Sequence, residues 1–175
     1  MNRIIFFVVS TLLFVQAYGS VIDCMPTVGG RQYDLTPLVN EDGFYFWQQE
    51  YNGTNWYWQL QICADVWNQN ISSCENPSPV NQISSDFKDC YSCGQTLVSA
   101  WDTVPSGNGI RLTYFHGDPI NNVSWRQTSI YIECDKKGNN FPSFEHYRTC
   151  SYSEDGDSNE LGPIYHFFIS TKYVC

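Results

Sequence analysis

Apolar or β-branched residues alternate with other residues in several short runs along the chain. Two of these runs, residues 110–115 and 128–134, are joined by a polar connection that contains Gly-Asp-Pro and several asparagines. Two aromatic runs, residues 43–47 and 56–63, flank a turn-prone Asn-Gly-Thr-Asn sequence, which predicts a β-hairpin. Aromatic residues make up 17% of the chain and no long run has helical periodicity, so we predict an antiparallel all-β domain of short strands.

Further strands are predicted at residues 97–101 and 164–175. Residues 33–38 predict a short extended segment that ends at its proline. The stretch 65–89 is polar and has little periodicity, so it predicts a loop, held through Cys74 by a bond to Cys90 or Cys93.

The chain begins with a lightly basic Met-Asn-Arg, an apolar run at residues 4–15 and a small-x-small pattern that ends at Gly19. These features predict a cleaved signal peptide, residues 1–19, and a single domain over residues 20–175. An uncleaved anchor is the alternative, but the apolar run is short for a membrane span of about 20 residues. No second apolar run of this kind follows, so no membrane span is expected after cleavage.

Cysteines and sequons both favour an exported protein. An even number of cysteines in such a domain favours disulfides, and the Cys-Tyr-Ser-Cys spacing alone is weak evidence for a redox or zinc site. The eight cysteines are Cys24, Cys63, Cys74, Cys90, Cys93, Cys134, Cys150 and Cys175. The three glycosylation sequons begin at Asn52, Asn70 and Asn122. We therefore expect a secreted protein or one in the secretory or endolysosomal lumen.

Net charge excludes some partners. The formal charge is -9, and loss of Arg3 with the signal peptide makes it -10, which disfavours nucleic acid and anionic membranes. The acidic stretch at residues 151–162 is interpreted as a solvated insertion. It lacks the D-x-[DN]-x-[DN]-G spacing of a calcium loop, so no metal is expected.

Catalytic patterns are missing from the sequence. It contains no G-x-S-x-G, no H-E-x-x-H and no P-loop, and the three histidines, His116, His146 and His166, lack metal-ligand spacing. With every cysteine expected in a disulfide, no nucleophilic thiol is left. We therefore predict a binding protein without a cofactor, not an enzyme.

Arg126 is the first candidate for binding, because it stands at the start of the run that ends at Cys134. Planar polar side chains such as Arg, Glu and Gln hold sugars by paired hydrogen bonds, while Tyr or Trp packs on the ring. Further motifs accompany this arginine in a fixed order. They are Tyr-Asp-Leu-Thr-Pro-Leu at 33–38, the aromatic run ending at Cys63, Ile-Arg-Leu-Thr-Tyr at 110–114 with Gly117-Asp118, Arg126 eight residues before Cys134, and Tyr165 ten residues before Cys175.

This order resembles the mannose 6-phosphate receptor homology (MRH) domain, the module of the mannose 6-phosphate receptors and of endoplasmic reticulum lectins. The resemblance covers nearly all of the mature chain. It implies a flattened β-barrel or sandwich of two sheets, stabilised by disulfides, that binds mannose through a Gln, an Arg, a Glu and a Tyr. It also implies the disulfides Cys24–Cys63 and Cys134–Cys175.

Carried onto this sequence, the resemblance makes Arg126 and Tyr165 the sugar-binding Arg and Tyr. For the Glu, Glu160 is preferred to Glu145, and for the Gln, Gln95 is preferred to Gln69. Trp58, in the aromatic run before Cys63, is similar in position to the paired tryptophans of the lectins.

One departure from the family concerns the connection before Arg126. The family usually has a cysteine there, bonded to the cysteine near the Glu, but residues 119–125 contain none. Cys74, Cys90, Cys93 and Cys150 are therefore left to form two bonds of open choice. A glycan on Asn122 would crowd this connection and disfavour phosphate recognition more than mannose recognition.

The sequence thus predicts a lectin-like domain whose partners are mannose-containing glycans or glycoproteins. The alternative is an MRH-fold protein-interaction or structural module without sugar affinity.

Overall fold

The structure is a computed structural model. It describes residues 22–51, 53–67, 74, 77–120, 124–137, 143–149 and 161–175, and for residues 51, 143–149 and 161–163 only the backbone. The strands are β1 (Thr27–Val28), β2 (Arg31–Gln32), β3 (Tyr45–Tyr51), β4 (Thr54–Leu60), β5 (Val80–Ser84), β6 (Cys90–Ser92), β7 (Gln95–Thr103), β8 (Gly109–Phe115), β9 (Trp125–Cys134), β10 (Ser143–Thr149) and β11 (Leu161–Thr171). Two short 3-10 helices are η1 (Thr36–Leu38) and η2 (Lys172–Val174).

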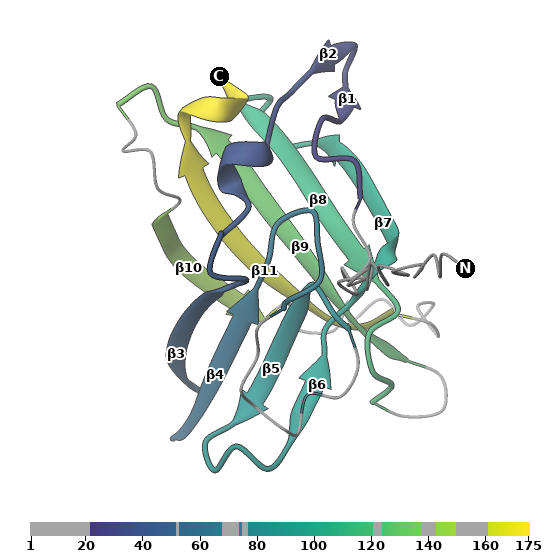
Figure 1. Ribbon diagram of the computed structural model, residues 1–175, viewed down its shortest axis with the longest axis vertical. Coiled ribbons are helices and arrows are strands. Elements are labelled where there is room, and N and C mark those ends of the chain that lie inside the picture. Colours follow the sequence, from purple (N-terminus) through teal and green to yellow (C-terminus); the bar gives the residue numbers. More distant parts are fainter. Residues whose placement is uncertain are drawn as a thin grey trace, which may run out of the picture.

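Two open sheets form the domain. One has five strands in the order β10-β11-β9-β8-β7, the other has four in the order β3-β4-β5-β6, and β1 and β2 make a separate hairpin. The four-stranded sheet packs across the longer one, with the β1–β2 hairpin and the C-terminus at one end of the molecule and the β5–β6 turn at the other (Figure 1). The predicted all-β, disulfide-stabilised class is confirmed, as a sandwich that does not close into a barrel. No helix within the described ranges is long and apolar enough to cross a membrane.

Alternation along each strand creates the core. In β8 every second residue is buried, so one face of the strand is apolar and faces the other sheet. The inner faces of both sheets supply most of the buried hydrophobic side chains. These include Trp58, Leu60, Val80, Ile110, Leu112, Tyr114, Ile130, Ile132, Phe167 and Ile169.

The predicted strand pairs are present with small shifts in their bounds. β3 and β4 form the expected hairpin, in which Tyr51 is opposite Thr54 and Gly53 takes a positive φ of 75° in the turn. β8 and β9 are neighbours in the five-stranded sheet, so the two runs on either side of the polar connection do belong to one sheet. One pair departs from the antiparallel prediction, because β11 returns between β10 and β9 and runs parallel to β9.

Two local predictions are wrong. The stretch 65–89 contains a buried strand, β5, at the centre of the four-stranded sheet, where a loop was expected. The pattern did not predict this strand because the strand contains buried polar residues. Asn81 is 1% exposed, and its side-chain amide donates to the Gln59 amide oxygen, also buried, at 3.3 Å. Residues 33–38 are not wholly extended either, since they end in η1, where proline suits the first turn.

Disulfides fasten the ends of several strands. They are Cys24–Cys63, Cys74–Cys90 and Cys134–Cys175, with Cα–Cα distances of 5.4, 5.1 and 4.7 Å. Cys24–Cys63 and Cys134–Cys175 are the two pairs that the resemblance implied. The third disulfide joins Cys74 to Cys90 and not to Cys93. The C-terminal residue is tied to the end of β9, as expected.

The expectation that every cysteine is paired is wrong for Cys93. Within the described residues this cysteine carries a free thiol that is fully buried, directly after β6. Burial raises the pKa of the Cys93 thiol, against an opposing effect of the nearby Arg126. The thiol is therefore protonated and shielded, which makes it a poor nucleophile. Cys150 lies outside the described residues.

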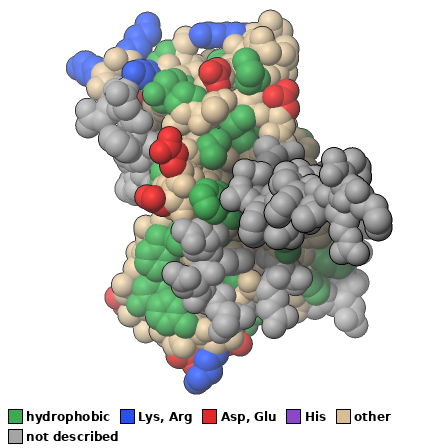
Figure 2. All heavy atoms as spheres, in the orientation of Figure 1, with side chains coloured by type: hydrophobic (Ala, Val, Ile, Leu, Met, Phe, Trp, Pro, Cys, Tyr) green, Lys and Arg blue, Asp and Glu red, His purple; other side chains and the backbone are tan. Residues whose placement is uncertain are grey.

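The outer face of the four-stranded sheet carries a stack of aromatic rings. Phe46 stacks on Tyr57 with ring centroids 5.7 Å apart, and Tyr57 stacks on Phe87 at 4.7 Å. Figure 2 shows hydrophobic side chains gathered over β3 and β4 on this part of the molecule. These stacked rings add packing between neighbouring segments on the side of the sheet away from the core.

Buried hydrogen bonds join the two sheets. The Thr128 hydroxyl on β9 donates to the carbonyl of Cys93 at 2.7 Å, and the Tyr114 hydroxyl accepts from the backbone N–H of Cys63 at 3.1 Å. Such bonds fix the position of one sheet relative to the other, since breaking them would leave a polar group unpaired inside the protein.

We therefore expect Thr128→Val, which keeps the side-chain shape, to lower the free energy of unfolding by about 1–3 kcal/mol, measured by urea unfolding. Thr103→Val is the matched control, because Thr103 is exposed on β7 and should change stability by no more than about 0.5 kcal/mol. Equal effects of the two substitutions would show that the link between the sheets contributes nothing.

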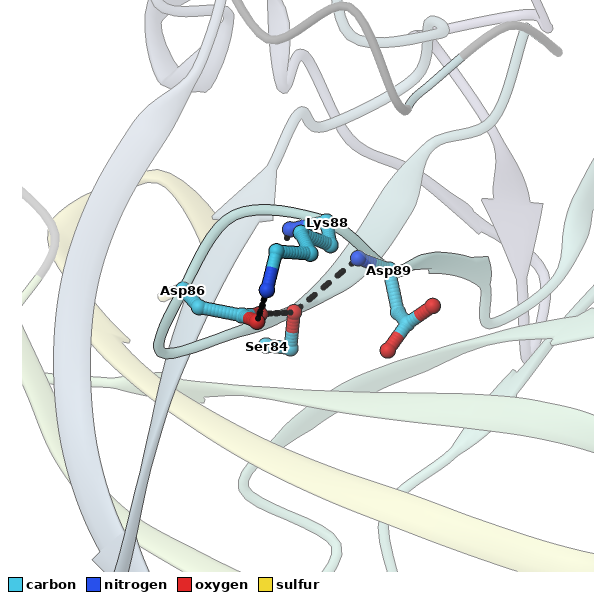
Figure 3. A network of polar contacts seen from close by, with 4 residues as sticks. All are labelled: Ser84, Asp86, Lys88 and Asp89. Atoms are coloured by element: carbon cyan, nitrogen blue, oxygen red, sulfur yellow. Dashed lines mark hydrogen bonds and ion pairs between the residues drawn. The ribbon is translucent and has the colours of Figure 1, made fainter.

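The β5–β6 turn is closed by side chains, as Figure 3 shows for Ser84, Asp86, Lys88 and Asp89. The Asp86 carboxylate accepts from the Ser84 hydroxyl at 2.7 Å and pairs with the Lys88 ammonium at 2.8 Å. The bond from Lys88, followed by the one from Ser84, lowers the pKa of Asp86 from 3.8 to about 2.

An NMR titration of the carboxyl groups should therefore place the pKa of Asp86 near 2. Because the folded-state pKa lies below the unfolded value, this carboxylate stabilises the protein above about pH 4 and loses that contribution as the pH falls toward 2. Lys88→Ala should raise the pKa toward 3.8, whereas Lys136→Ala, at an exposed lysine elsewhere, should leave it unchanged. An ordinary pKa for Asp86 in the unmodified protein would contradict this view of the turn.

Candidate functional site

Arg126 stands at the second residue of β9, at the entrance of the strand as predicted. Its backbone N–H donates to the Asp118 carbonyl at 3.1 Å, and its carbonyl accepts from the Gly117 N–H at 2.8 Å. The Gly-Asp sequence of the motif thus holds the backbone of the arginine on both sides. A guanidinium on such a fixed backbone can be directed at a ligand with little loss of freedom.

The connection that carries this Gly-Asp pair is itself fastened to the other sheet. The Asp118 carboxylate accepts from the Ser92 N–H at 2.8 Å, and the Asp118 N–H donates to the Ser92 carbonyl at 2.7 Å. A Cβ on Gly117 would collide with the Ser92 carbonyl oxygen, so only glycine allows this close approach. The end of β6 and the start of β9 therefore form one rigid junction.

The Arg126 guanidinium lies over the ring of Tyr91, with its central carbon 4.1 Å from the ring centroid. One terminal nitrogen donates to the Pro119 carbonyl at 3.4 Å, and the guanidinium lies near enough to Tyr165 to act on its pKa. Its Nε is buried and has no hydrogen-bond partner among the described residues. Arg126 therefore has one N–H donor without a partner in the described part of the chain.

Tyr165, on β11, is the second predicted residue that the structure brings to this point. It is 5% exposed, and its hydroxyl donates to the amide oxygen of Gln82 at 3.1 Å. Burial raises the pKa of Tyr165, with a smaller opposing effect from Arg126, so the hydroxyl stays protonated. The two predicted residues are thus neighbours, as a shared sugar site requires.

Gln82, on β5, is the site residue that the sequence did not reveal. It lies in the stretch predicted as a loop, where its neighbours Asn81 and Ser84 give no apolar alternation. Its side chain is buried and comes from the opposite sheet to Tyr165. Gln95, the preferred glutamine, is exposed at the start of β7, and none of the described contacts joins it to Arg126 or Tyr165.

Trp58 forms the floor beneath Tyr165. It is 1% exposed, and its ring meets Tyr165 edge to face at 5.0 Å and Phe167 at 5.5 Å. At this burial Trp58 positions Tyr165 and does not offer a face for stacking against a sugar.

Other predicted residues are not placed. Glu145 is on β10, at an irregular register between Phe144 and Tyr147, but its side chain lies outside the described part of the chain. Also outside it are Gln69, Glu160 and the sequon residues Asn52, Asn70 and Asn122.

The described groups have hydrogen-bonding chemistry that can match hydroxyl groups. Arg126 offers an unpaired donor, and Gln82 and Tyr165 together offer an amide and a hydroxyl within a buried pair. Amides and hydroxyls can both donate and accept, which matches sugar hydroxyls. Within the described ranges no group of three or more His, Cys, Asp or Glu residues is placed to hold a metal ion.

Comparisons with known proteins bear on the fold. The chain is similar in structure to domain 11 of the echidna mannose 6-phosphate/insulin-like growth factor 2 receptor, solved by NMR, with a TM-score of 0.51 and 18% sequence identity over 87% of this chain and 94% of that one. No protein-family model and no curated protein matches the chain. At this identity the likeness shows the fold and agrees with the resemblance read from the motifs: this chain has the fold of a mannose 6-phosphate receptor domain.

Proposed function

We propose that the chain is a lectin-like domain that binds mannose-type N-glycans and catalyses no reaction. The observation that carries the proposal is the buried Nε of Arg126, unpaired among the described residues, beside the Tyr165–Gln82 hydrogen bond. The Arg and the Tyr that the resemblance marked as sugar ligands meet there, and a glutamine joins them. The similar solved domain belongs to a receptor named for mannose 6-phosphate, which supports the same class of ligand.

The site favours a neutral sugar. Arg126 already lies on Tyr91 and donates to the Pro119 carbonyl, and Asp118 lies close enough to Cys93 to act on its pKa in the direction opposite to Arg126. Asp118 also stands in the junction that holds the Arg126 backbone, and its negative charge disfavours a phosphate dianion there while it has little effect on neutral hydroxyls. We therefore propose mannose without phosphate as the preferred ligand, with Glu160 as a further sugar ligand.

The same proposal includes the compartment and the boundaries of the protein. Three disulfides support a secreted protein or one in the secretory or endolysosomal lumen. Residues 1–19 would be removed as a signal peptide, and the domain would begin at residue 20.

Titration calorimetry with methyl α-mannoside, together with a glycan array, tests this proposal. Arg126→Lys and Tyr165→Phe should each weaken mannose binding at least tenfold, or about 1.4 kcal/mol, because each removes a buried donor without removing the bulk of the side chain. Arg111→Lys is the matched control. Arg111 lies on the outer face of β8 and pairs with Asp102 at 2.8 Å, so its replacement should leave affinity within about twofold.

If the unmodified protein binds no mannose-containing glycan, the lectin proposal is wrong. The fold would then serve protein interaction or structure, as the alternative hypothesis holds. Equal losses in Arg126→Lys and Arg111→Lys would show that the loss does not come from the site, since both substitutions keep the positive charge.

A further inference from the structure

The inner face of the four-stranded sheet carries a second group of polar and aromatic side chains next to Arg126. Gln49 on β3 is directly opposite Trp56 on β4, and the pair Trp47 and Trp58 is two residues further along the same strands. Side chains two residues apart point to the same face of a strand. Trp58 contacts Tyr165, so Gln49 and Trp56 belong to the face on which the Arg126 site lies.

A continuous series of contacts links the two groups. The Trp56 ring lies against the Tyr91 ring with centroids 6.5 Å apart and a tilt of 51°, and Arg126 covers Tyr91 at 4.1 Å. Tyr91 is in turn opposite Gln82 in the sheet. Successive rows on one face of a sheet are about 7 Å apart, so Trp56 and Gln49 lie one row beyond the Gln82–Tyr91 row, a step comparable to one sugar ring.

The side chain of Gln49 contains an acceptor without a hydrogen-bond donor among the described residues. This acceptor is the amide oxygen, which is buried. Buried acceptors in folded proteins nearly always have a donor, and a ligand is one way to supply it. Trp56, opposite Gln49, is only partly buried and offers an aromatic face of the kind on which the apolar side of a sugar ring packs.

We propose that Gln49 and Trp56 form a second sugar position, so that the ligand is at least a disaccharide of the mannose type. The first ring binds Arg126, Tyr165 and Gln82. The next ring packs on Trp56 and donates a hydroxyl hydrogen to the Gln49 amide oxygen. This inference rests on the proposed function, because it extends the same site along the sheet.

Calorimetric titration of the whole mature protein separates the two proposals, with methyl α-mannoside and the α-1,2-, α-1,3- and α-1,6-linked mannose disaccharides as probes. At least one disaccharide should bind about five- to tenfold more tightly than the monosaccharide. Trp56→Ala and Gln49→Met should each remove this gain. Gln49→Met should also unfold at the same or a higher urea concentration, since it removes an unpaired buried acceptor, and it remains informative if Trp56→Ala does not fold.

Gln48 and Tyr57 provide matched controls, because they form the neighbouring cross-strand pair on the opposite face of the same hairpin. Gln48→Ala and Tyr57→Phe should leave the affinity for both kinds of sugar within about twofold. If methyl α-mannoside binds but no disaccharide binds more tightly, or if the Gln49 and Trp56 variants keep the gain, the second position is wrong and the lectin proposal stands. If neither sugar binds, both proposals are wrong.

Discussion

The hydrogen bond between the Tyr165 hydroxyl and the Gln82 amide oxygen is the contact on which the site depends. Its two partners come from opposite sheets and are both buried, so the bond fixes where β11 lies over β5. Apolar packing alone tolerates some sliding of one sheet over another, whereas a buried polar pair loses its partner when either strand shifts. Trp58 fills the space beneath Tyr165 and keeps the ring in that position. The Tyr165–Gln82 pair is thus held by the core.

Arg126 reaches this pair because the chain approaches itself closely at Gly117. The glycine lies against the backbone of residues 92–94, and Asp118 exchanges two hydrogen bonds with Ser92. These contacts fix the first part of the β8–β9 connection and the arginine that follows it, which leaves variation to the residues between. The cysteine usual in the MRH family, which this sequence resembles, would fall in this connection and is missing, so the guanidinium can keep its position while the surroundings of the ligand change.

Alternation and turn chemistry predicted much of this fold, and burial of polar residues explains most of what they missed. The β8 and β9 runs, the β3–β4 hairpin and two of the disulfide pairs follow from local pattern or from the resemblance. β5 does not, because Asn81 and Gln82 occupy buried positions that only their tertiary partners make favourable. For the same reason Arg126 and Tyr165 could be chosen from spacing, whereas the glutamine that meets them could not. A rule based on the distance from a cysteine selected Gln95, which faces solvent.

Two buried atoms have no hydrogen-bond partner among the described residues, and they limit which chemical groups a ligand can offer at the site. The Arg126 Nε is a donor that needs an acceptor, and the Gln49 amide oxygen is an acceptor that needs a donor. Arg111 also leaves its Nε unpaired, but its guanidinium is held by Asp102 on the outer face of the other sheet. A phosphate or carboxylate could satisfy Arg126 and would do nothing for Gln49. Hydroxyl groups both donate and accept, so a ligand with several hydroxyls along one face can satisfy both atoms, and an oligosaccharide has this arrangement.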